Sequence, residues 1–216
     1  MLAGVDPLID RAGALIRPGR RALLGITGSP GAGKTTLAQA LVERLNADRG
    51  PGVAAYLPMD GFHLANASLE RLGRRDRKGA PDTFDGWGFV GLLRRVREET
   101  DHDVYAPSFR RVVDEPVAGE IAIAAGTALV VVEGNYLLVD SEPWDRVPAL
   151  LDESWFCVTS AEERQLRLVD RHTRHGRSAE DATAWVGAVD EANARVIEAS
   201  RDRADLLVSG TGGLTA

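Results

Sequence analysis

Between residues 28 and 36 the chain reads Gly28-Ser29-Pro30-Gly31-Ala32-Gly33-Lys34-Thr35-Thr36. Its first eight residues match the pattern G-x-x-x-x-G-K-[ST], which is typical of a loop that wraps around the phosphates of a nucleotide. Such a loop needs a strand before it and a helix after it, and an apolar run and a stretch of helical period occupy these places. Glycines let backbone N–H groups turn toward an anion, and the helix directs its positive end there. We therefore expect residues 28–36 to bind a nucleotide.

The end of this loop has predicted roles in phosphate and metal binding. Lys34 would bridge the β- and γ-phosphates, and the Thr35 hydroxyl would ligate Mg²⁺. The alternative is a glycine-rich turn with an incidental lysine, and the strand and helix on either side argue against it. The sequence has no N-K-x-D tetrapeptide of the kind that reads guanine. ATP and Mg²⁺ are therefore the expected cofactors.

Short runs rich in Val, Ile and Leu alternate along the chain with longer stretches of helical period. This alternation is typical of a parallel sheet covered by helices on both faces. Strands are predicted at residues 22–27, 53–59, 128–133, 154–159 and 205–209. Helices are predicted at residues 35–45, 89–99, 161–172 and 179–201, with a short amphipathic helix that starts near Asp6. The predicted fold class is α/β, a three-layer P-loop NTPase fold with a central, mostly parallel sheet.

Two long intervals between these elements contain many turn-forming residues. They are residues 73–85 and 103–126, and the second is punctuated by Pro107, Pro116 and Gly119. Long connections in a compact domain are usually functional loops. We therefore expect both intervals to be loops near the site.

The composition describes one ordinary domain. The chain has 216 residues, a formal charge of −6 and 44% hydrophobic residues. A chain of this length buries a core without disulfides, and Cys157 is its only cysteine. We expect a single domain over residues 1–216, a reducing, cytoplasmic compartment, and an inert thiol within a buried strand.

The sequence also argues against two classes of partner. Lys and Arg residues are scattered in an acidic chain, so we expect no nucleic acid. The longest apolar run, residues 122–132, is shorter than the roughly 20 residues that span a bilayer, so we expect no membrane segment. The expected partner is a small-molecule acceptor. The oligomeric state stays open, with a homodimer as one option.

Acidic residues end two of the predicted strands. Asp60 follows the second strand within the segment 59–63, and Glu133 ends the third. In an open parallel sheet the carboxyl ends of the strands face the ligand crevice. We expect Asp60 to accept the proton of an acceptor hydroxyl and Glu133 to hold Mg²⁺, directly or through its waters. The alternatives are an aspartate that starts a turn and an ordinary strand-terminating acid.

Three arginines are spaced by four and three residues along one predicted helix. They are Arg167, Arg171 and Arg174. This spacing places them on one face, and guanidinium groups match phosphate oxygens bidentately. A helical lid at about residues 160–180 would bring positive charge to the transferred group and exclude water. The alternative is a solvated helix face held by ion pairs within the helix.

Five segments together carry a resemblance to a known group of enzymes. GSPGAGKTT, MDGFH, KGAPDTFD, VVVEGNYLL and RLVDRHTRHGRS follow one another between residues 28 and 178. In this order and spacing they resemble the phosphoribulokinase, uridine kinase and bacterial pantothenate kinase superfamily of P-loop kinases. The resemblance extends over about residues 23–208, and it is strongest to a nucleoside/nucleotide kinase branch that includes proteins labelled as fructose transport system kinases.

The resemblance implies roles for individual residues. The acid of the D-G-F-H segment is the catalytic base in the superfamily, which implies this role for Asp60, and His63 would face the acceptor. The lysine of K-G-x-P approaches the acceptor, which implies the same for Lys78. Glu133 matches the acid that ends the later strand, which implies a position beside both the metal and the acceptor. The resemblance assigns phosphate binding in the lid to Arg167, Arg171, Arg174 and Arg177.

The acceptor region departs from the pattern of uridine kinases. Those enzymes carry an aromatic-Asp-His segment after a proline, whereas this chain reads Pro107-Ser108-Phe109-Arg110-Arg111. Arg110 replaces a carboxylate that would bond a sugar or nucleoside hydroxyl. An arginine pair favours an acceptor with a carboxylate or phosphate, and the alternative is that Arg110 faces solvent. Phe109 and Arg110 are therefore candidate acceptor-binding residues.

These features predict an ATP-dependent kinase that transfers the γ-phosphate to a hydroxyl of a small metabolite. A sugar, a nucleoside and a pantothenate-like molecule are the acceptors considered. Lys34, Asp60 and Arg171 are the predicted catalytic residues. Two alternatives stay open. One is an ATP-binding regulatory switch or ATPase, which does not need Asp60 near an acceptor, and the other is a nucleoside monophosphate kinase.

Overall fold

A five-stranded parallel sheet forms the centre of the protein, in the order β2-β5-β1-β6-β7. The computed structural model describes residues 6–210. The strands are β1 Ala22–Thr27, β2 Ala54–Pro58, β5 Leu129–Glu133, β6 Glu153–Val158 and β7 Leu206–Ser209. The predicted α/β class is confirmed, and each predicted strand differs by at most one residue at either end.

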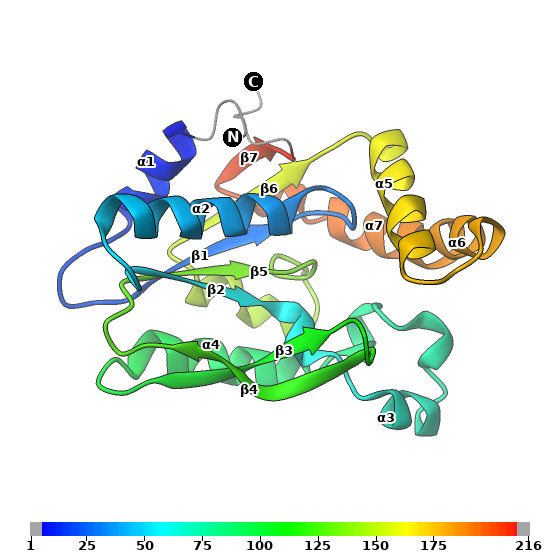
Figure 1. Ribbon diagram of the computed structural model, residues 1–216, viewed down its shortest axis with the longest axis horizontal. Helices are drawn as coiled ribbons and strands as arrows, with labels where there is room; N and C mark the ends of the chain where they lie inside the picture. Colours follow the sequence, from blue (N-terminus) through cyan, green and yellow to red (C-terminus); the bar gives the residue numbers. More distant parts are fainter. Residues whose placement is uncertain (1–5, 211–216) are drawn as a thin grey trace.

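Helices cover both faces of this sheet (Figure 1). Helices α1 Asp6–Ala14 and α2 Lys34–Arg49 pack on one face, and α4 Gly86–Glu98 and α7 Glu191–Glu198 pack on the other. The described residues also form helices α3 Asn66–Arg71, α5 Ala161–Arg174 and α6 Ala179–Trp185. Alternate residues of a strand point to opposite faces, so each strand contributes to two cores. Leu24 of β1 packs with α1 and α2, whereas Leu23 packs with α4 and with Ile197 of α7. The result is three layers, with the sheet in the middle.

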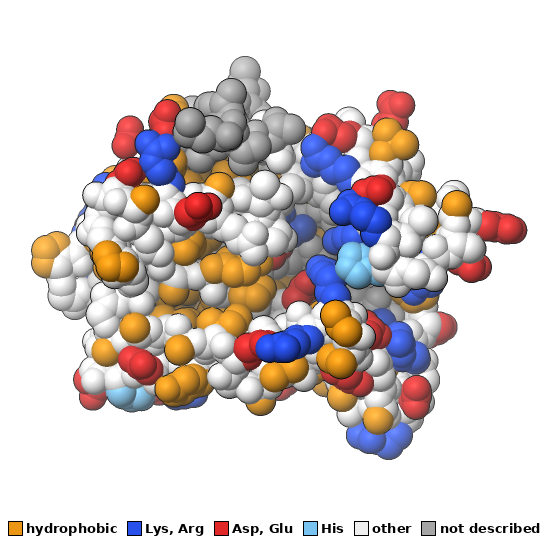
Figure 2. All heavy atoms as spheres, viewed as in Figure 1, with side chains coloured by type: hydrophobic (Ala, Val, Ile, Leu, Met, Phe, Trp, Pro, Cys, Tyr) orange, Lys and Arg blue, Asp and Glu red, His pale blue; other side chains and the backbone are white. Residues whose placement is uncertain are grey.

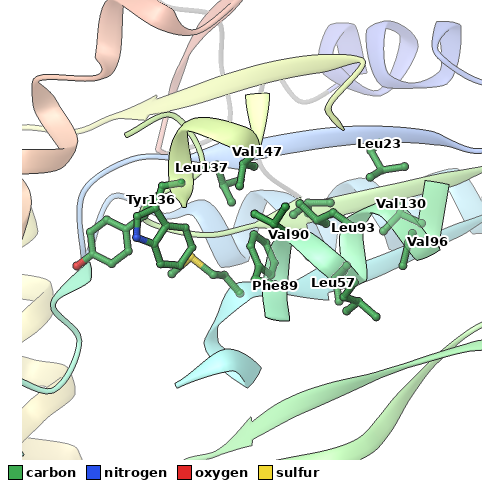
Figure 3. Packing of buried hydrophobic residues seen from close by; sticks show 14 of the residues in the cluster. Leu23, Leu57, Phe89, Val90, Leu93, Val96, Val130, Tyr136, Leu137 and Val147 are labelled. Carbon is green, nitrogen blue, oxygen red and sulfur yellow. The ribbon is translucent and has the colours of Figure 1, made fainter. Parts of the chain in front are cut away.

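The core under α4 holds the carboxyl ends of the strands in place (Figure 3). Phe89 and Leu93 of α4 are fully buried with Leu57 of β2 and Val130 of β5. Burial of one such side chain contributes about 1.5–3 kcal/mol. The loops that follow β1, β2 and β5 therefore start from a rigid base.

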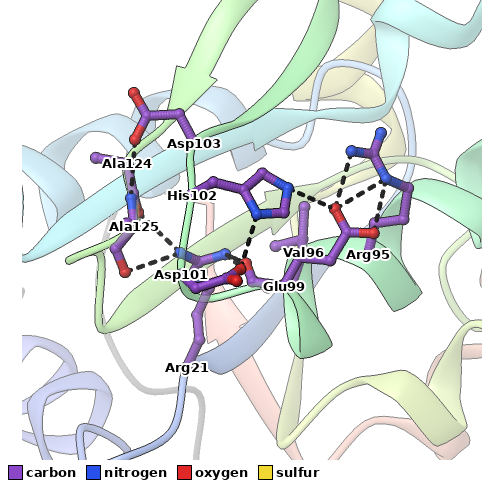
Figure 4. A network of polar contacts seen from close by, with 9 residues as sticks. All are labelled: Arg21, Arg95, Val96, Glu99, Asp101, His102, Asp103, Ala124 and Ala125. Atoms are coloured by element: carbon purple, nitrogen blue, oxygen red, sulfur yellow. Dashed lines mark hydrogen bonds and ion pairs between the residues drawn. The ribbon is translucent and has the colours of Figure 1, made fainter.

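A polar network joins the start of β1 to α4 and to the loop before β5 (Figure 4). Arg21 is almost fully buried and donates to the carbonyl oxygens of Val96, Thr127 and Ala124 at 2.7, 3.0 and 2.8 Å. A buried guanidinium needs such acceptors for its five donors. Arg21 thereby satisfies carbonyls at the end of α4 and in the loop after β4.

The interval 103–126 is a β-hairpin, so the prediction of a loop there is wrong. Strand β3 Val104–Arg110 pairs antiparallel with β4 Glu115–Ile123 in a separate two-stranded sheet. Pro107 lies at an irregularity between Ala106 and Ser108, a position where a ladder tolerates proline. The hairpin is half exposed, so it lacks the continuous apolar run by which the buried strands were found.

The helical predictions need two smaller corrections. The helix predicted over residues 179–201 is interrupted by a π-helical turn, Val186–Asp190, between α6 and α7. The interval 73–85 contains two short 3₁₀ turns, and the preceding helix α3 was not predicted. Ser160 and Ser178 cap α5 and α6, because their side chains accept from the third N–H of the helices. None of the helices within residues 6–210 combines the length and apolarity that crossing a membrane requires.

Candidate active site

A cavity of about 880 Å³ lies at the carboxyl end of the sheet. Its walls are the loop after β1, the segment after β2, the end of β5, the hairpin β3–β4 and helix α5. Figure 2 shows it as a hollow between the body of the protein and α5, with Lys, Arg and His side chains gathered on the α5 side. This is the edge where the strand-end acids were predicted to meet.

The loop from Gly28 to Gly33 needs its glycines for both conformation and space. Gly28 and Gly33 have φ of 141° and 93°, a region that L side chains rarely adopt. A Cβ on Gly28 would lie 2.6 Å from the Cys157 carbonyl oxygen, and one on Gly33 would lie 2.2 Å from that of Gly210. The loop is therefore packed tightly against β6 and the segment after β7, with its N–H groups at the start of α2.

Lys34 is a buried cation at the floor of the cavity. Its side chain donates from Nζ to the Ser29 carbonyl oxygen at 3.1 Å, and the residue is 6% exposed. Burial lowers the pKa of Lys34, and the Glu133 carboxylate opposes this shift. A buried lysine whose charge is not fully neutralised attracts anions, and a loop that binds a polyphosphate requires such a cation.

Three oxygen atoms meet beside Lys34. Glu133 Oε2 accepts from Thr35 Oγ1 at 3.3 Å and from the Tyr56 hydroxyl at 2.9 Å. Burial raises the pKa of Glu133, and the charge of Lys34 lowers it. Hard oxygen ligands of this kind fit Mg²⁺, which in nucleotide sites also takes water and phosphate oxygens. The described residues hold no cluster of three or more His, Cys, Asp or Glu side chains that would bind a metal without water or phosphate ligands.

Asp60 lies in the 3₁₀ turn Met59–Phe62 that follows β2. Its carboxylate is partly exposed to the cavity, and its Oδ2 lies 3.6 Å from Nη2 of Arg111. The Asp60 backbone oxygen binds Nδ1 of His63 at 2.8 Å. Because a carbonyl oxygen only accepts, this contact assigns the proton of the neutral ring to Nδ1. Asp60 therefore offers its carboxylate to the cavity while its backbone orients the histidine.

Two aromatic rings enclose His63. Its ring centroid is 4.0 Å from that of Phe84 and 4.8 Å from that of Phe109. Burial in this position lowers the pKa of His63, and the Asp60 carboxylate opposes the shift. His63 and Phe109 thus form an aromatic part of the cavity wall beside Asp60.

Lys78 lines the same cavity, but its donors already have partners. Its side chain is only 7% exposed, and Nζ lies 2.7 Å from Asn66 Oδ1 and 2.6 Å from the Asp114 carbonyl oxygen. Asp114 Oδ2 lies 3.1 Å away, which completes the three acceptors that an ammonium group can bind. Lys78 therefore joins the loop before α4 to the tip of the hairpin.

The structure does not place Arg110 in the cavity. Arg110 is exposed and forms an ion pair with Glu120 across the hairpin, whereas Phe109 and Arg111 line the cavity. Alternation of side chains along β3 puts Phe109 on the face opposite to Arg110, and Arg111 follows the strand in the turn of the hairpin. Of the two arginines, Arg111 is the one that lines the cavity.

The predicted lid arginines all line the cavity. Arg167 donates to the Gly31 carbonyl oxygen at 3.2 Å, and Arg174 pairs with Asp170 on the exposed side of α5. Arg171 forms no ion pair with any carboxylate in residues 6–210. Burial lowers the pKa of Arg171, and the charge of Arg111 lowers it further. Within residues 6–210 Arg171 is thus the one arginine of α5 without an ion pair, although the charges of Asp190, Asp60 and Glu133 partly offset the lowering of its pKa.

Three further residues support the site and were not predicted from the sequence. Tyr56 holds Glu133, and Glu198 of α7 accepts from the Ser29 hydroxyl at 2.5 Å. Arg164 is 4% exposed, lies 3.5 Å from the Pro30 carbonyl oxygen and forms an ion pair with Glu191 of α7. Arg164 precedes Arg167 by three residues, so it extends the row of arginines on the same helix face.

Cys157 lies behind the phosphate-binding loop. The thiol is fully buried, and burial raises its pKa to about 12. A thiol with so high a pKa is not a nucleophile at neutral pH, as was predicted from the buried strand pattern.

Comparisons with known proteins point to one family. Residues 23–212 match the model of the Phosphoribulokinase / Uridine kinase family. A Schizosaccharomyces pombe protein that is provisionally named a uridine kinase, C227.14, is 32% identical over 187 residues, which are 85% of this chain and 80% of that protein. The Escherichia coli protein YggC is 32% identical over 207 residues, which are 95% of this chain and 85% of that protein.

A solved structure resembles the whole fold. It is the crystal structure of a provisionally named fructose transport system kinase from Silicibacter sp. TM1040, with a TM-score of 0.85 and 37% identity. The match covers 93% of this chain and 97% of that one. The family resemblance seen in the sequence is thereby confirmed.

Proposed function

Because this chain belongs to the Phosphoribulokinase / Uridine kinase family of P-loop kinases, we propose that it transfers the γ-phosphate of ATP to a hydroxyl of a small metabolite. The observation that carries the proposal is the arrangement of one cavity. A buried cation, Lys34, lies on its floor, and a carboxylate, Asp60, lies on its wall. Arg171, which forms no ion pair within residues 6–210, lines the same cavity from α5.

The nucleotide half of the cavity is built to hold phosphates. The N–H groups of the loop and Lys34 would bind the β- and γ-phosphates, and Thr35 with Glu133 would bind Mg²⁺. When bound, Mg·ATP supplies the phosphoryl group and an electrophilic phosphorus. Arg167 and Arg171 would neutralise the charge that develops on the transferred group, an effect worth several kcal/mol in a water-excluded site.

The acceptor half supplies a base. As the acceptor hydroxyl attacks the γ-phosphorus, its proton would pass to a carboxylate oxygen of Asp60, while the bond from the γ-phosphorus to the bridging oxygen breaks and ADP leaves. His63 and Phe109 would pack against the body of the acceptor, and thereby hold its hydroxyl in line. A regulatory switch that hydrolyses ATP would have no need for this enclosed wall. The names of the relatives point to sugars and nucleosides as the first acceptors to test.

The test is release of ADP from ATP and Mg²⁺ in the presence and absence of candidate acceptors. The panel consists of sugars, nucleosides, hydroxy acids, pantothenate and phosphorylated forms of these. We expect acceptor-dependent release of ADP together with a phosphorylated product seen by mass spectrometry. Release of ADP that is independent of every acceptor, with inorganic phosphate as the sole product, would contradict the proposal.

A further inference from the structure

Arg111 is a cation on the acceptor wall whose ion pair with Asp60 is too long to be a hydrogen bond. Its side chain is half exposed to the cavity, and its one ion pair among residues 6–210 is with Asp60. The 3.6 Å between Arg111 Nη2 and Asp60 Oδ2 exceeds the length of a hydrogen bond. The guanidinium therefore has donors available for a ligand.

The other cations on this side of the cavity are already matched. Arg75 donates to Asp114 Oδ2 at 2.9 Å, and Lys78 binds the same carboxylate. Arg110, the neighbour of Arg111, lies outside the cavity and pairs with Glu120. Arg111 is thus the residue through which this wall can attract negative charge.

The opposite wall reinforces this positive region. Arg171 of α5 lacks an ion pair in the described part of the chain and is close enough to Arg111 for their charges to repel. Both arginines line one cavity, and guanidinium groups match the oxygens of carboxylates and phosphates, so this region favours an anion. Since Lys34 and Arg167 lie on the side of the phosphate-binding loop, the nucleotide has its own cations, and Arg111 belongs to the acceptor.

We propose that the phosphate acceptor carries an anionic group, a carboxylate or a phosphate, that binds Arg111 while the acceptor hydroxyl lies against Asp60. The two side chains are close enough to contact one small molecule. Asp60 would repel such an anion if Arg111 did not lie beside it, so Arg111 determines the preference for a charged acceptor. This inference rests on the proposed kinase function.

Matched pairs of acceptors test the inference on the wild-type protein. Each pair shares a carbon skeleton and differs in the anionic group: pantothenate and pantothenol, glycerate and glycerol, fructose 6-phosphate and fructose. The measurement is kcat/KM for ADP release. We expect at least about tenfold higher kcat/KM for the anionic member of the pair that is used, because a charge-assisted hydrogen bond contributes about that factor or more.

Substitution of Arg111 separates anion binding from a merely structural role. Arg111→Gln should raise the KM for the anionic acceptor about tenfold to a hundredfold, and should leave kcat/KM for its neutral partner within a few fold. Arg111→Lys should restore part of the affinity. Arg110→Gln is the matched control, because that side chain is adjacent but outside the cavity, and it should behave as the wild type.

Three results would overturn the inference. If the neutral member of a pair is the better substrate of the wild type, the acceptor is not anionic, although the kinase function stands. If Arg111→Gln lowers kcat equally for both members and leaves KM unchanged, Arg111 acts only by holding Asp60. If no acceptor of either kind stimulates ADP release, the kinase function fails and the inference fails with it.

Discussion

Replacing Asp60 by asparagine removes the proposed base and keeps the shape of the side chain. A general base contributes roughly two to four orders of magnitude to such a step. At 1.36 kcal/mol for each factor of ten, this equals about 2.7–5.5 kcal/mol of activation free energy. We therefore expect kcat for acceptor-dependent transfer to fall by that factor in Asp60→Asn.

The structure predicts that folding and nucleotide binding survive this change. The Asp60 side chain is 36% exposed, and its one ion pair, with Arg111, is long. An exposed pair of this kind contributes at most about 1 kcal/mol to stability. Lys34 and the loop around it do not depend on Asp60 for a hydrogen bond. The midpoint of urea unfolding and the Kd for ATP should therefore stay close to their wild-type values.

The assay is steady-state kinetics with an acceptor that the panel identifies, together with calorimetric titration of ATP. Asp48→Asn is the matched control, because Asp48 is an exposed aspartate of α2 whose ion pair lies on the surface. Asparagine still accepts a hydrogen bond, so KM for the acceptor should change less than kcat. Transfer by Asp60→Asn within a few fold of the wild type would refute the assignment of Asp60 as the base.

Further predictions concern other parts of the molecule. Lys34→Ala should abolish turnover and weaken ATP binding in calorimetry, because the loop loses its buried cation, and unchanged affinity would exclude the phosphate role. Arg171→Ala should lower kcat more than it raises the KM for ATP, since its charge acts most strongly as charge develops in transfer, and equal effects on both constants would contradict this. The pKa of His63 lies below its ordinary 6.5, so the contribution of the neutral ring to the free energy of unfolding is complete above about pH 6.5. This contribution is lost as pH falls through the lowered pKa. In urea titrations, His63→Gln should therefore lose less stability than the wild type over the same fall in pH. Phe89→Ala should lower the free energy of unfolding by about 3–5 kcal/mol in urea titrations, because the ring is fully buried under the sheet.

Local patterns in the sequence were enough to predict the central sheet and the phosphate-binding loop. A buried parallel strand needs an apolar run on both faces, and β1, β2, β5, β6 and β7 each have one. The loop from Gly28 to Thr35 needs particular residues at particular spacings, because backbone conformation there depends on glycine. The caps at Ser160 and Ser178 are likewise short-range, since each side chain binds an N–H three residues later. The strand-end position of Asp60 and Glu133 followed from the sheet topology that these patterns imply.

Other features depend on contacts between segments far apart in the chain. The hairpin β3–β4 is stabilised by its cross-strand pairing and by packing of Val104, Ala106 and Ile123 on the core, which a weak local pattern does not reveal. Pairing of Lys78 with Asp114 and of Arg110 with Glu120 removes two predicted cations from those free to bind a ligand. Arg111 and Arg171 line one cavity because the hairpin β3–β4 and α5 form two of its walls. The sequence gives the type of each side chain, whereas the packing of distant segments sets its burial and its counter-charge. Burial and counter-charge decide which arginines can bind an anion.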